Sequence, residues 1–243
     1  MSYEPRTYRR SVAAEDLVAF EVVVRETDLL ILARLDLTDM ALALVAEARQ
    51  QLESFIAATP RFAESFVPLD VPASAPPLVR RMAEAAALAG VGPMAAVAGA
   101  VSEHVALGLQ TFSEEVVVEN GGDDFVILTR ERLVAIHAGG SPLSGRVALR
   151  VAAKATPLAI ATSSGTVGPS VSLGSADAVT ILSANGALAD AVASAVGNRV
   201  HSSDDAQAAL EVARRVPGVT GAVIVVGDTM AVWGAVDLVP LAG

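Results

Sequence analysis

The sequence predicts an α+β fold. An apolar hairpin pattern occupies residues 18–34, and four strand patterns follow one another without an intervening helix between residues 115 and 151. Helical patterns also come in groups, the longest between residues 78 and 109. A doubly wound parallel sheet would instead alternate strand and helix along the chain. We find no convincing tandem repeat. We therefore expect a single domain over residues 1–243, built from mixed or antiparallel sheets packed with helices.

The first two elements follow from simple periodicity. Two apolar stretches flank the polar residues RETD at 25–28, which predicts the hairpin. A helix over residues 39–58 comes next, because apolar residues beginning with Leu42 recur at helical spacing. Thr38 or Asp39 is a suitable residue to cap the start of this helix.

A Pro-rich connection and two helices follow. Residues 59–77 lack periodicity, so they form either a surface linker or a wall over a pocket. A helix over residues 78–89 ends at Gly90, and a proline in the following turn suits the first turn of a second helix over 93–109. The uncharged run 85–102 is broken by glycine and proline, so we interpret it as part of two buried helices and not as a membrane span.

The second half of the chain begins with strands and ends with a hairpin. The strand patterns cover 115–119, 124–129, 132–137 and 146–151, then the buried segment LAIATSSG and residues 177–183. The remaining patterns predict helices over 186–198 and 204–215 and a closing hairpin, GAVIVVGDTMAVWG.

Composition excludes several classes of function. Hydrophobic residues make up 53% of the 243 residues, which excludes a disordered chain. The absence of cysteine excludes disulfides, thiolate metal sites and cysteine nucleophiles. The net charge of −10, with Lys154 as the only lysine, argues against nucleic acid and anionic membranes as partners. The charged N-terminal residues lack the apolar core of a signal peptide, and we expect a cytoplasmic protein.

The stretch VVVENGGDD at residues 116–124 ends a strand in a turn that is suited to a ligand. Gly121 and Gly122 permit positive φ angles and a close backbone approach, and Asn120 and Asp123 add polar groups. An ordinary hairpin turn uses the same residue types. Both interpretations stay open from the residues alone.

Two further glycine-rich elements are candidates for anion binding. GVGPM at residues 90–94 precedes a helix, whose free N–H groups favour a phosphate, although for this stretch alone a plain helix–helix turn is the preferred interpretation. TSSGTVGPS at residues 162–170 places hydroxyl groups around two glycines. It forms either a pocket for an anion or a sugar, or an ordinary loop. The hydroxyl and glycine residues of this loop that we take as candidates are Thr162, Ser163, Ser164, Gly165 and Thr166.

A carboxylate and a hydroxyl share one face of the helix predicted over residues 186–198. Asp190 and Ser194 lie four residues apart, so both side chains point to the same side. Hard oxygen donors of this kind suit Mg²⁺ or Ca²⁺, with water and ligand phosphates completing the coordination. Asp190 is equally suited to capping the helix or to solvent.

Taken in order, these segments resemble a known family. GVGPMAAVAGAVSE, VVVENGGDD, SPLSG, IATSSGTVGPSVSLGSADAVT and ADAVASAVGNRV look like the motifs of an ApbE-like family over about residues 20–236. That family is related to the flavin transferases, which move FMN from FAD onto a protein threonine. The resemblance implies an ApbE-like fold, FAD or a related diphosphate nucleotide as ligand, and Mg²⁺.

The resemblance also implies roles for residues. The turn formed by Asn120, Gly121, Gly122 and Asp123 matches the Gly-Gly-Asp turn that lies against the flavin nucleotide. Asp190 and Ser194 match the metal-binding helix, with serine in place of the usual threonine. The backbone carbonyl near Ala161 would complete that metal site.

One difference from the transferases, a missing lysine, leaves three possible functions open. The transferases carry a lysine in an Asp-x-Gly-Gly-x-x-Lys-Gly segment, where this chain has GVGPMAAVAGAVSE. The chain is therefore a Mg²⁺-assisted enzyme that acts on a nucleotide pyrophosphate, a flavin- or nucleotide-binding protein without turnover, or an assembly protein that keeps the fold. A small-molecule nucleotide is the expected partner, and a homodimer is a further possibility.

Overall fold

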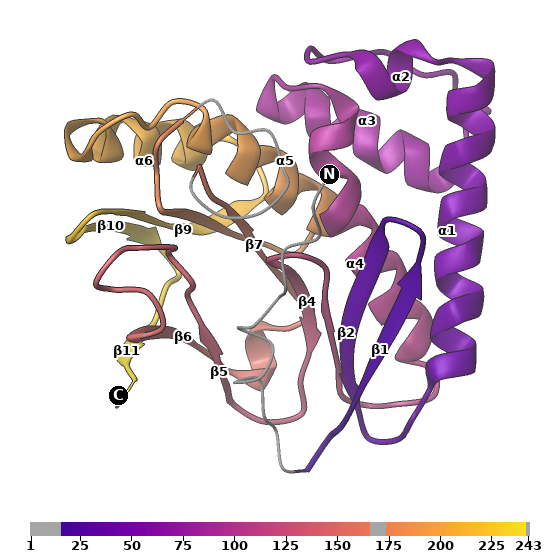
Figure 1. The fold of residues 1–243 in the computed structure, drawn as a ribbon, viewed down its shortest axis with the longest axis horizontal. Helices are drawn as coiled ribbons and strands as arrows, with labels where there is room; N and C mark the ends of the chain where they lie inside the picture. The colour runs from indigo at the N-terminus through magenta and orange to yellow at the C-terminus, as the bar shows by residue number, and fades with distance from the viewer. Residues whose placement is uncertain (1–15, 166–173, 242–243) are drawn as a thin grey trace.

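A computed structural model describes residues 16–165 and 174–241. Its elements form a large sheet with helices on one face and a small sheet against part of the other (Figure 1). The large sheet has eight strands in the order β1-β2-β3-β4-β7-β8-β9-β10. All its neighbouring strands pair antiparallel. The α+β prediction is confirmed.

The bounds of the strands follow the predicted patterns closely. The large sheet contains β1 (Val18–Val24), β2 (Thr27–Ala33), β3 (Val116–Glu119), β4 (Asp123–Ile127), β7 (Leu158–Ser163), β8 (Ala178–Ser183), β9 (Val219–Val226) and β10 (Thr229–Gly234). The small sheet contains β5 (Arg132–Ala135), β6 (Val147–Val151) and β11 (Leu238–Pro240), in the order β11-β6-β5.

The helices also lie close to the expected positions. They are α1 (Thr38–Ala58), α2 (Arg61–Glu64), α3 (Pro77–Ala89), α4 (Val97–Leu109), α5 (Gly186–Gly197) and α6 (Ala206–Arg215). Short 3₁₀ turns are η2 (Pro93–Ala96), η3 (Ala153–Ala155) and η4 (Ser203–Asp205). The helix expected over residues 93–109 is thus a 3₁₀ turn that continues into α4.

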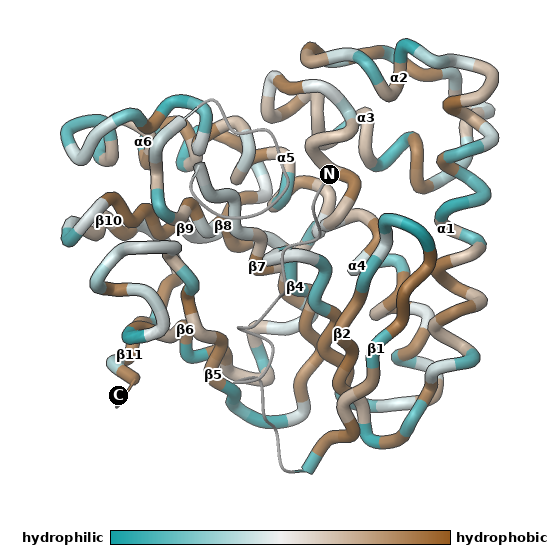
Figure 2. Tube along the Cα trace, viewed as in Figure 1, coloured by the Kyte–Doolittle hydropathy of each residue, from teal (hydrophilic) through white to brown (hydrophobic). Residues whose placement is uncertain are grey.

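Two hydrophobic cores lie on opposite faces of the large sheet. The larger core joins β2, β3, β7, β8 and β9 to α1, α3, α4, α5 and α6. The smaller core lies between the large sheet and the small one. Strand β2 is buried along its whole length, and Figure 2 shows it as a continuous hydrophobic stretch that begins beside a hydrophilic β1–β2 turn. Burial on both faces explains why β2 lacks the polar alternation of a half-exposed strand.

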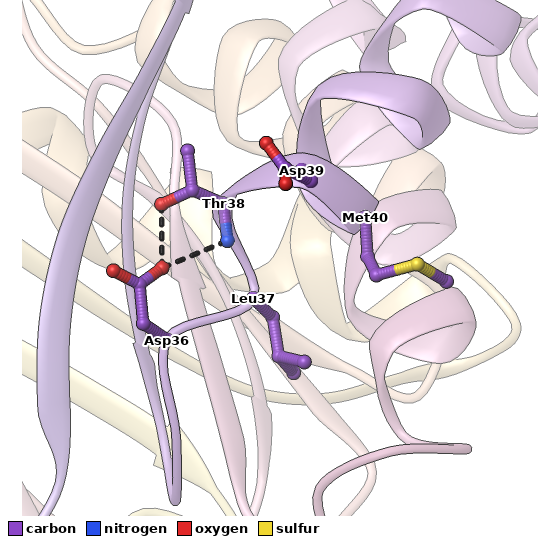
Figure 3. A pocket seen from close by; sticks show the side chains of 5 residues that line it. All are labelled: Asp36, Leu37, Thr38, Asp39 and Met40. Atoms are coloured by element: carbon purple, nitrogen blue, oxygen red, sulfur yellow. Dashed lines mark hydrogen bonds between the residues drawn. The ribbon is translucent and has the colours of Figure 1, made fainter.

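The start of α1 differs from the prediction. The helix turns out to begin without a side-chain cap from its own N-cap residue, Leu37. Instead Asp36 accepts hydrogen bonds from the Thr38 backbone N–H at 2.9 Å and from the Thr38 hydroxyl at 2.6 Å (Figure 3). The prediction of Thr38 or Asp39 as cap is therefore wrong by two residues or more, because the acid that precedes the helix reaches its first turn.

A buried ion cluster ties the large sheet to β5. Glu115 is fully buried and accepts hydrogen bonds from Arg34 at 2.9 Å, from the Thr129 hydroxyl at 2.8 Å and from Arg132. Burial alone would raise the pKa of Glu115, but the hydrogen bonds from Arg132 and Thr129 outweigh it and hold this pKa below its ordinary value. The cluster is a charged substitute for apolar packing at this end of the molecule.

Among the described residues, no single helix is long and apolar enough to cross a membrane. Helix α3 and the continuous η2–α4 segment together reach the length and composition of a span, but they bend by 105° at the break between them. Both helices contribute to the larger core.

Candidate functional site

The turn between β3 and β4 needs both of its glycines. Gly121 has a φ of +70° and Gly122 a φ of +104°, conformations that other residues adopt only with strain. The Gly122 N–H donates to the Glu119 carboxylate at 3.0 Å, and the Asn120 N–H donates to the Asp123 carbonyl at 3.2 Å. The hairpin geometry predicted for this stretch is present, and both glycines serve it.

The same turn lies against the end of β7. The Thr162 N–H donates to the Gly122 carbonyl at 3.0 Å, and a Cβ on Gly122 would lie 3.3 Å from the Thr162 carbonyl oxygen. Asp123 pairs with Ala161 across the two strands. The turn and the strand that leads into TSSG therefore meet directly, although 40 residues separate Gly122 from Thr162 in the sequence.

Beyond Ala161, β7 runs toward the C-terminal end of α5. The Thr162 and Thr180 hydroxyl oxygens lie 2.9 Å apart. A Cβ on Gly197, the last residue of α5, would lie 3.3 Å from the Ser163 hydroxyl oxygen. The Gly165 N–H donates to the Ala176 carbonyl at 2.9 Å. Ser163 thus faces α5, whereas Thr162 points to the opposite face of the sheet, where it meets Thr180.

Helix α5 brings Asp190 into the same region. Asp190 is 9% exposed, and its Oδ2 accepts from the Gly99 N–H at 2.9 Å, in the first turn of α4. Asn120 links this turn of α4 to the β3–β4 turn, because its amide nitrogen donates to the Ala98 carbonyl at 3.1 Å. Ser194, one helical turn after Asp190, is partly exposed.

Two carboxyl groups in this region resist ionisation. Burial raises the pKa of Asp190 to about 7, against hydrogen bonds from the Gly99 and Ala98 backbone that act in the other direction. Burial also raises the pKa of Asp123 well above its ordinary value, and the negative charges of Asp190, Asp124 and Glu119 raise it further. The two carboxyl groups are thus close enough to repel each other.

The predicted site residues therefore largely converge, and we call this region the Asp123–Asp190 site. Around it lie the turn residues Asn120, Gly121, Gly122 and Asp123, the β7 residues Ala161 and Ser163, and Asp190 with Ser194 on α5. Thr162 contacts the turn through its backbone N–H, and its side chain lies on the other face of the sheet. Ser164 and Gly165 follow the end of β7. Thr166 lies outside the described residues.

The surface depression at the start of α1 is a different place. Figure 3 shows that Asp36, Leu37, Thr38, Asp39 and Met40 line it. None of the predicted site residues is among them.

The glycines of GVGPM have structural explanations. Gly90 ends α3 with a φ of +74°, as a left-handed C-cap. A Cβ on Gly92 would lie 1.8 Å from the Ser65 carbonyl oxygen, so Gly92 permits contact with the Pro-rich segment. This stretch leads through η2 into α4, and so it positions the helix turn that contacts Asp190.

Gly99 and the alanines of the helix over 93–109 indicate from sequence that another backbone approaches closely, but not that the partner is α5. A Cβ on Gly99 would lie 2.1 Å from the Gly186 carbonyl oxygen, so the two backbones touch. Glu103 on α4 accepts from the Gly186 N–H at 2.7 Å. The sequence contains one indication of this pairing: the segments GAVSE at 99–103 and GALAD at 186–190 share the pattern Gly-Ala-x-x-acid.

The donor set suits a cation that keeps some of its own ligands. The described residues contain no group of three or more His, Cys, Asp and Glu side chains placed to hold a metal. Two buried carboxyl groups, a hydroxyl and a backbone carbonyl nevertheless fit Mg²⁺, which retains water and binds phosphate oxygens. A divalent cation would also offset the repulsion that raises the pKa of Asp123.

A family model described as "AbpE bacteria" matches residues 9–231. The chain belongs to this family. The resemblance expected from the motifs is thereby confirmed.

Curated relatives of this chain include UPF0280 proteins. The chain is 41% identical to a UPF0280 protein of Methanocella arvoryzae over 216 residues, which cover 87% of this chain and 86% of the relative. It is 34% identical to a UPF0280 protein of Methanocaldococcus jannaschii over 223 residues, covering 88% and 90%.

Solved structures share the fold. The flavin transferase ApbE from Vibrio cholerae aligns with a TM-score of 0.56 and 14% identity, covering 90% of this chain and 96% of that one. The ApbE protein from Thermotoga maritima aligns with a TM-score of 0.54 and 15% identity, covering 88% and 96%. At this identity the likeness shows the ApbE fold alone.

Proposed function

We propose that this protein binds FAD or a related diphosphate nucleotide together with Mg²⁺ and catalyses transfer or hydrolysis at the pyrophosphate. The observation that carries the proposal is the pair of buried carboxyl groups, Asp123 and Asp190, on elements distant in sequence. Buried carboxyl groups that repel each other become stable either by protonation or by a cation. A cation between them is the functional alternative.

Each part of the site has a role in this proposal. Asp190, the Ser194 hydroxyl and the Ala161 carbonyl would hold the metal, which when bound would supply Lewis-acid chemistry to the pyrophosphate. The turn at Asn120, Gly121, Gly122 and Asp123 lies against the flavin nucleotide, with the glycines allowing close approach. The residues Thr162, Ser163, Ser164, Gly165 and Thr166 accommodate phosphate oxygens.

Charge explains why a metal is required. The protein has a net charge of −10, and the carboxyl groups of the Asp123–Asp190 site would repel a diphosphate. Lys154, the only lysine, is exposed in η3 before the start of β7, whereas Ala161 and Thr162 lie toward the end of that strand. The lysine that the transferases carry is therefore not supplied from elsewhere in this chain.

Because Lys154 lies away from the Asp123–Asp190 site, a second candidate function is binding without turnover. Without a lysine at the site, the protein would bind the nucleotide and the metal but would not turn the nucleotide over. The fold shared with flavin transferases is compatible with both functions.

The test is AMP release from FAD and Mg²⁺ by the purified protein, with FAD-dependent thermal stabilisation measured in parallel. Asp190→Ala should abolish both. Asp39→Ala makes the same chemical change at an exposed position on α1 and should leave both unchanged. Stabilisation without AMP would support binding without turnover. Neither signal in the unaltered protein would overturn both functions.

The expectations about partners and location stay part of this proposal. We propose a small-molecule nucleotide as the partner, no nucleic acid, and a cytoplasmic location. A homodimer and the organisation as one domain also remain predictions. Sedimentation of the purified protein tests the dimer.

A further inference from the structure

Helices α4 and α5 cross at two glycines. A Cβ on Gly99 would lie 2.1 Å from the Gly186 carbonyl oxygen, and a Cβ on Gly186 would lie 2.3 Å from the Gly99 carbonyl oxygen. The contact is therefore reciprocal, backbone against backbone. No larger residue fits either position without moving a helix.

Each helix also supplies an acid to the first turn of the other. Asp190 on α5 accepts from the Gly99 N–H at 2.9 Å, and Glu103 on α4 accepts from the Gly186 N–H at 2.7 Å. Both acids are buried, with 9% and 8% of their surface exposed. Each stands four residues after its own glycine, so acid and glycine share one face of the helix. The crossing is locally two-fold symmetric.

The symmetry ends at the charges around the two acids. Glu103 has a cationic partner, because Arg81 Nη1 on α3 lies 3.4 Å from its Oε1. Asp190 instead lies near the carboxyl group of Asp123, and within the described residues it forms no ion pair with an arginine or lysine. The carboxyl group of Glu103 thus has a positively charged partner in the protein, whereas the carboxyl group of Asp190 does not among the described residues.

We propose that Glu103 is a positioning residue for Asp190. Because the backbones of α4 and α5 are in contact at the two glycines, a shift of the first turn of α5 moves the whole helix and with it Asp190. Glu103, held by Arg81, fixes that turn. Asp190 in turn fixes the first turn of α4. The two hydrogen bonds are therefore coupled, and loss of either one weakens the other. The role in holding a cation rests on the proposed function, whereas the coupling itself does not.

The coupling is tested by amide hydrogen exchange at Gly99 and Gly186, read by NMR in the full-length protein. Glu103→Ala removes the acceptor of the Gly186 N–H, so that amide should exchange at least about tenfold faster. If Glu103 positions Asp190, the Gly99 amide should also exchange about tenfold faster, although its own acceptor is unchanged. Glu103→Gln keeps an oxygen acceptor and should retain most of the protection at both amides.

The result that would overturn the proposal is faster exchange at Gly186 with an unchanged rate at Gly99. If Glu103→Ala does not fold, Glu103→Asp serves instead, because its shorter side chain withdraws the acceptor from Gly186.

Mn²⁺ binding to the same proteins gives the second readout. Affinity should fall at least about tenfold in Glu103→Ala and by less than about threefold in Glu103→Gln, because only the first variant frees the helix that carries Asp190. Absence of Mn²⁺ binding in the unaltered protein would overturn the proposed metal site, while the exchange rates would still decide whether Glu103 positions Asp190. Unchanged Mn²⁺ affinity in Glu103→Ala would overturn the positioning role.

Discussion

Replacing Gly99 by alanine should destabilise this protein more than most single substitutions do. The added Cβ would lie 2.1 Å from the Gly186 carbonyl oxygen, about 1.3 Å short of the 3.4 Å at which ordinary contact begins. Helices α4 and α5 must then separate. Overpacking of this kind costs about 1–3 kcal/mol. Separation also weakens the hydrogen bond from Gly99 to the buried Asp190, which at pH 8 is above its pKa of about 7 and charged, so that the bond is worth roughly 1.5–3 kcal/mol.

At pH 8 the two effects together predict a loss of about 2.5–6 kcal/mol in the free energy of unfolding. For a chain of this size, each kcal/mol lowers Tm by roughly 2–4 °C, so we expect a decrease of roughly 5–24 °C. Urea denaturation followed by circular dichroism measures the change. Gly140→Ala is the matched control, because a Cβ there meets nothing within 4 Å and the φ of Gly140 is not in the left-handed region. A loss below about 1 kcal/mol in Gly99→Ala would refute the reasoning, since the helices would then separate freely.

Three further predictions concern pH, the ion cluster and the Pro-rich segment. Burial raises the pKa of Asp190 to about 7, so protons compete with a cation for this carboxyl group below pH 7. The affinity for Mn²⁺, measured by calorimetry, should therefore fall roughly tenfold per pH unit from pH 7 to 5. An affinity that does not change with pH would contradict this. Glu115→Gln should cost about 3–5 kcal/mol in urea denaturation at pH 7, because two arginines lose a buried charge. Since the pKa of Glu115 is lowered in the folded state, its stabilisation is present above the unfolded pKa, near 4.5, and disappears as the pH falls below it; the Gln variant should lack this part of the acid sensitivity. Gly92→Ala should displace the Ser65 backbone, because the added Cβ would lie 1.8 Å from its carbonyl oxygen. Trypsin should then cleave faster after Arg61. Equal cleavage rates in this variant and in the Gly140→Ala control would exclude that displacement.

Local sequence predicted most of the elements but not how they pair. Short buried apolar runs located β7 and β8, and helical spacing located α1, because side-chain burial selects apolar residues directly. Strand β11 was missed, since its three residues are too few to show a period, and it is defined only by pairing with β6. On α1 the buried residues are Ala41, Val45 and Ala48, whereas Leu42 is 38% exposed. Small alanines face the sheet there, and hydrophobicity alone directs attention to the leucine.

The candidate site divides in the same way. The residues at 120–123 and at 190 and 194 stand out because glycine pairs and helix-face acids have recognisable spacing. Their convergence depends on contacts across the fold, such as the pairing of Asp123 with Ala161, which no local pattern encodes. Glu103 escaped notice because a single acid in an apolar helix has no distinctive neighbours. Its meaning appears only when α5 is placed against α4.

The isolation of Lys154 makes this protein convenient for spectroscopy. Amine-reactive dyes have one side-chain target, exposed on η3 ahead of β7, besides the chain's terminal amine. A fluorophore attached there reports from the far end of the strand that carries Ala161, and Trp233 on β10 supplies a single intrinsic donor for energy transfer. The native chain, with no cysteine to mask, also accepts a thiol label at any chosen position. Ligand-induced changes can thus be followed by fluorescence without first removing native lysine or cysteine residues.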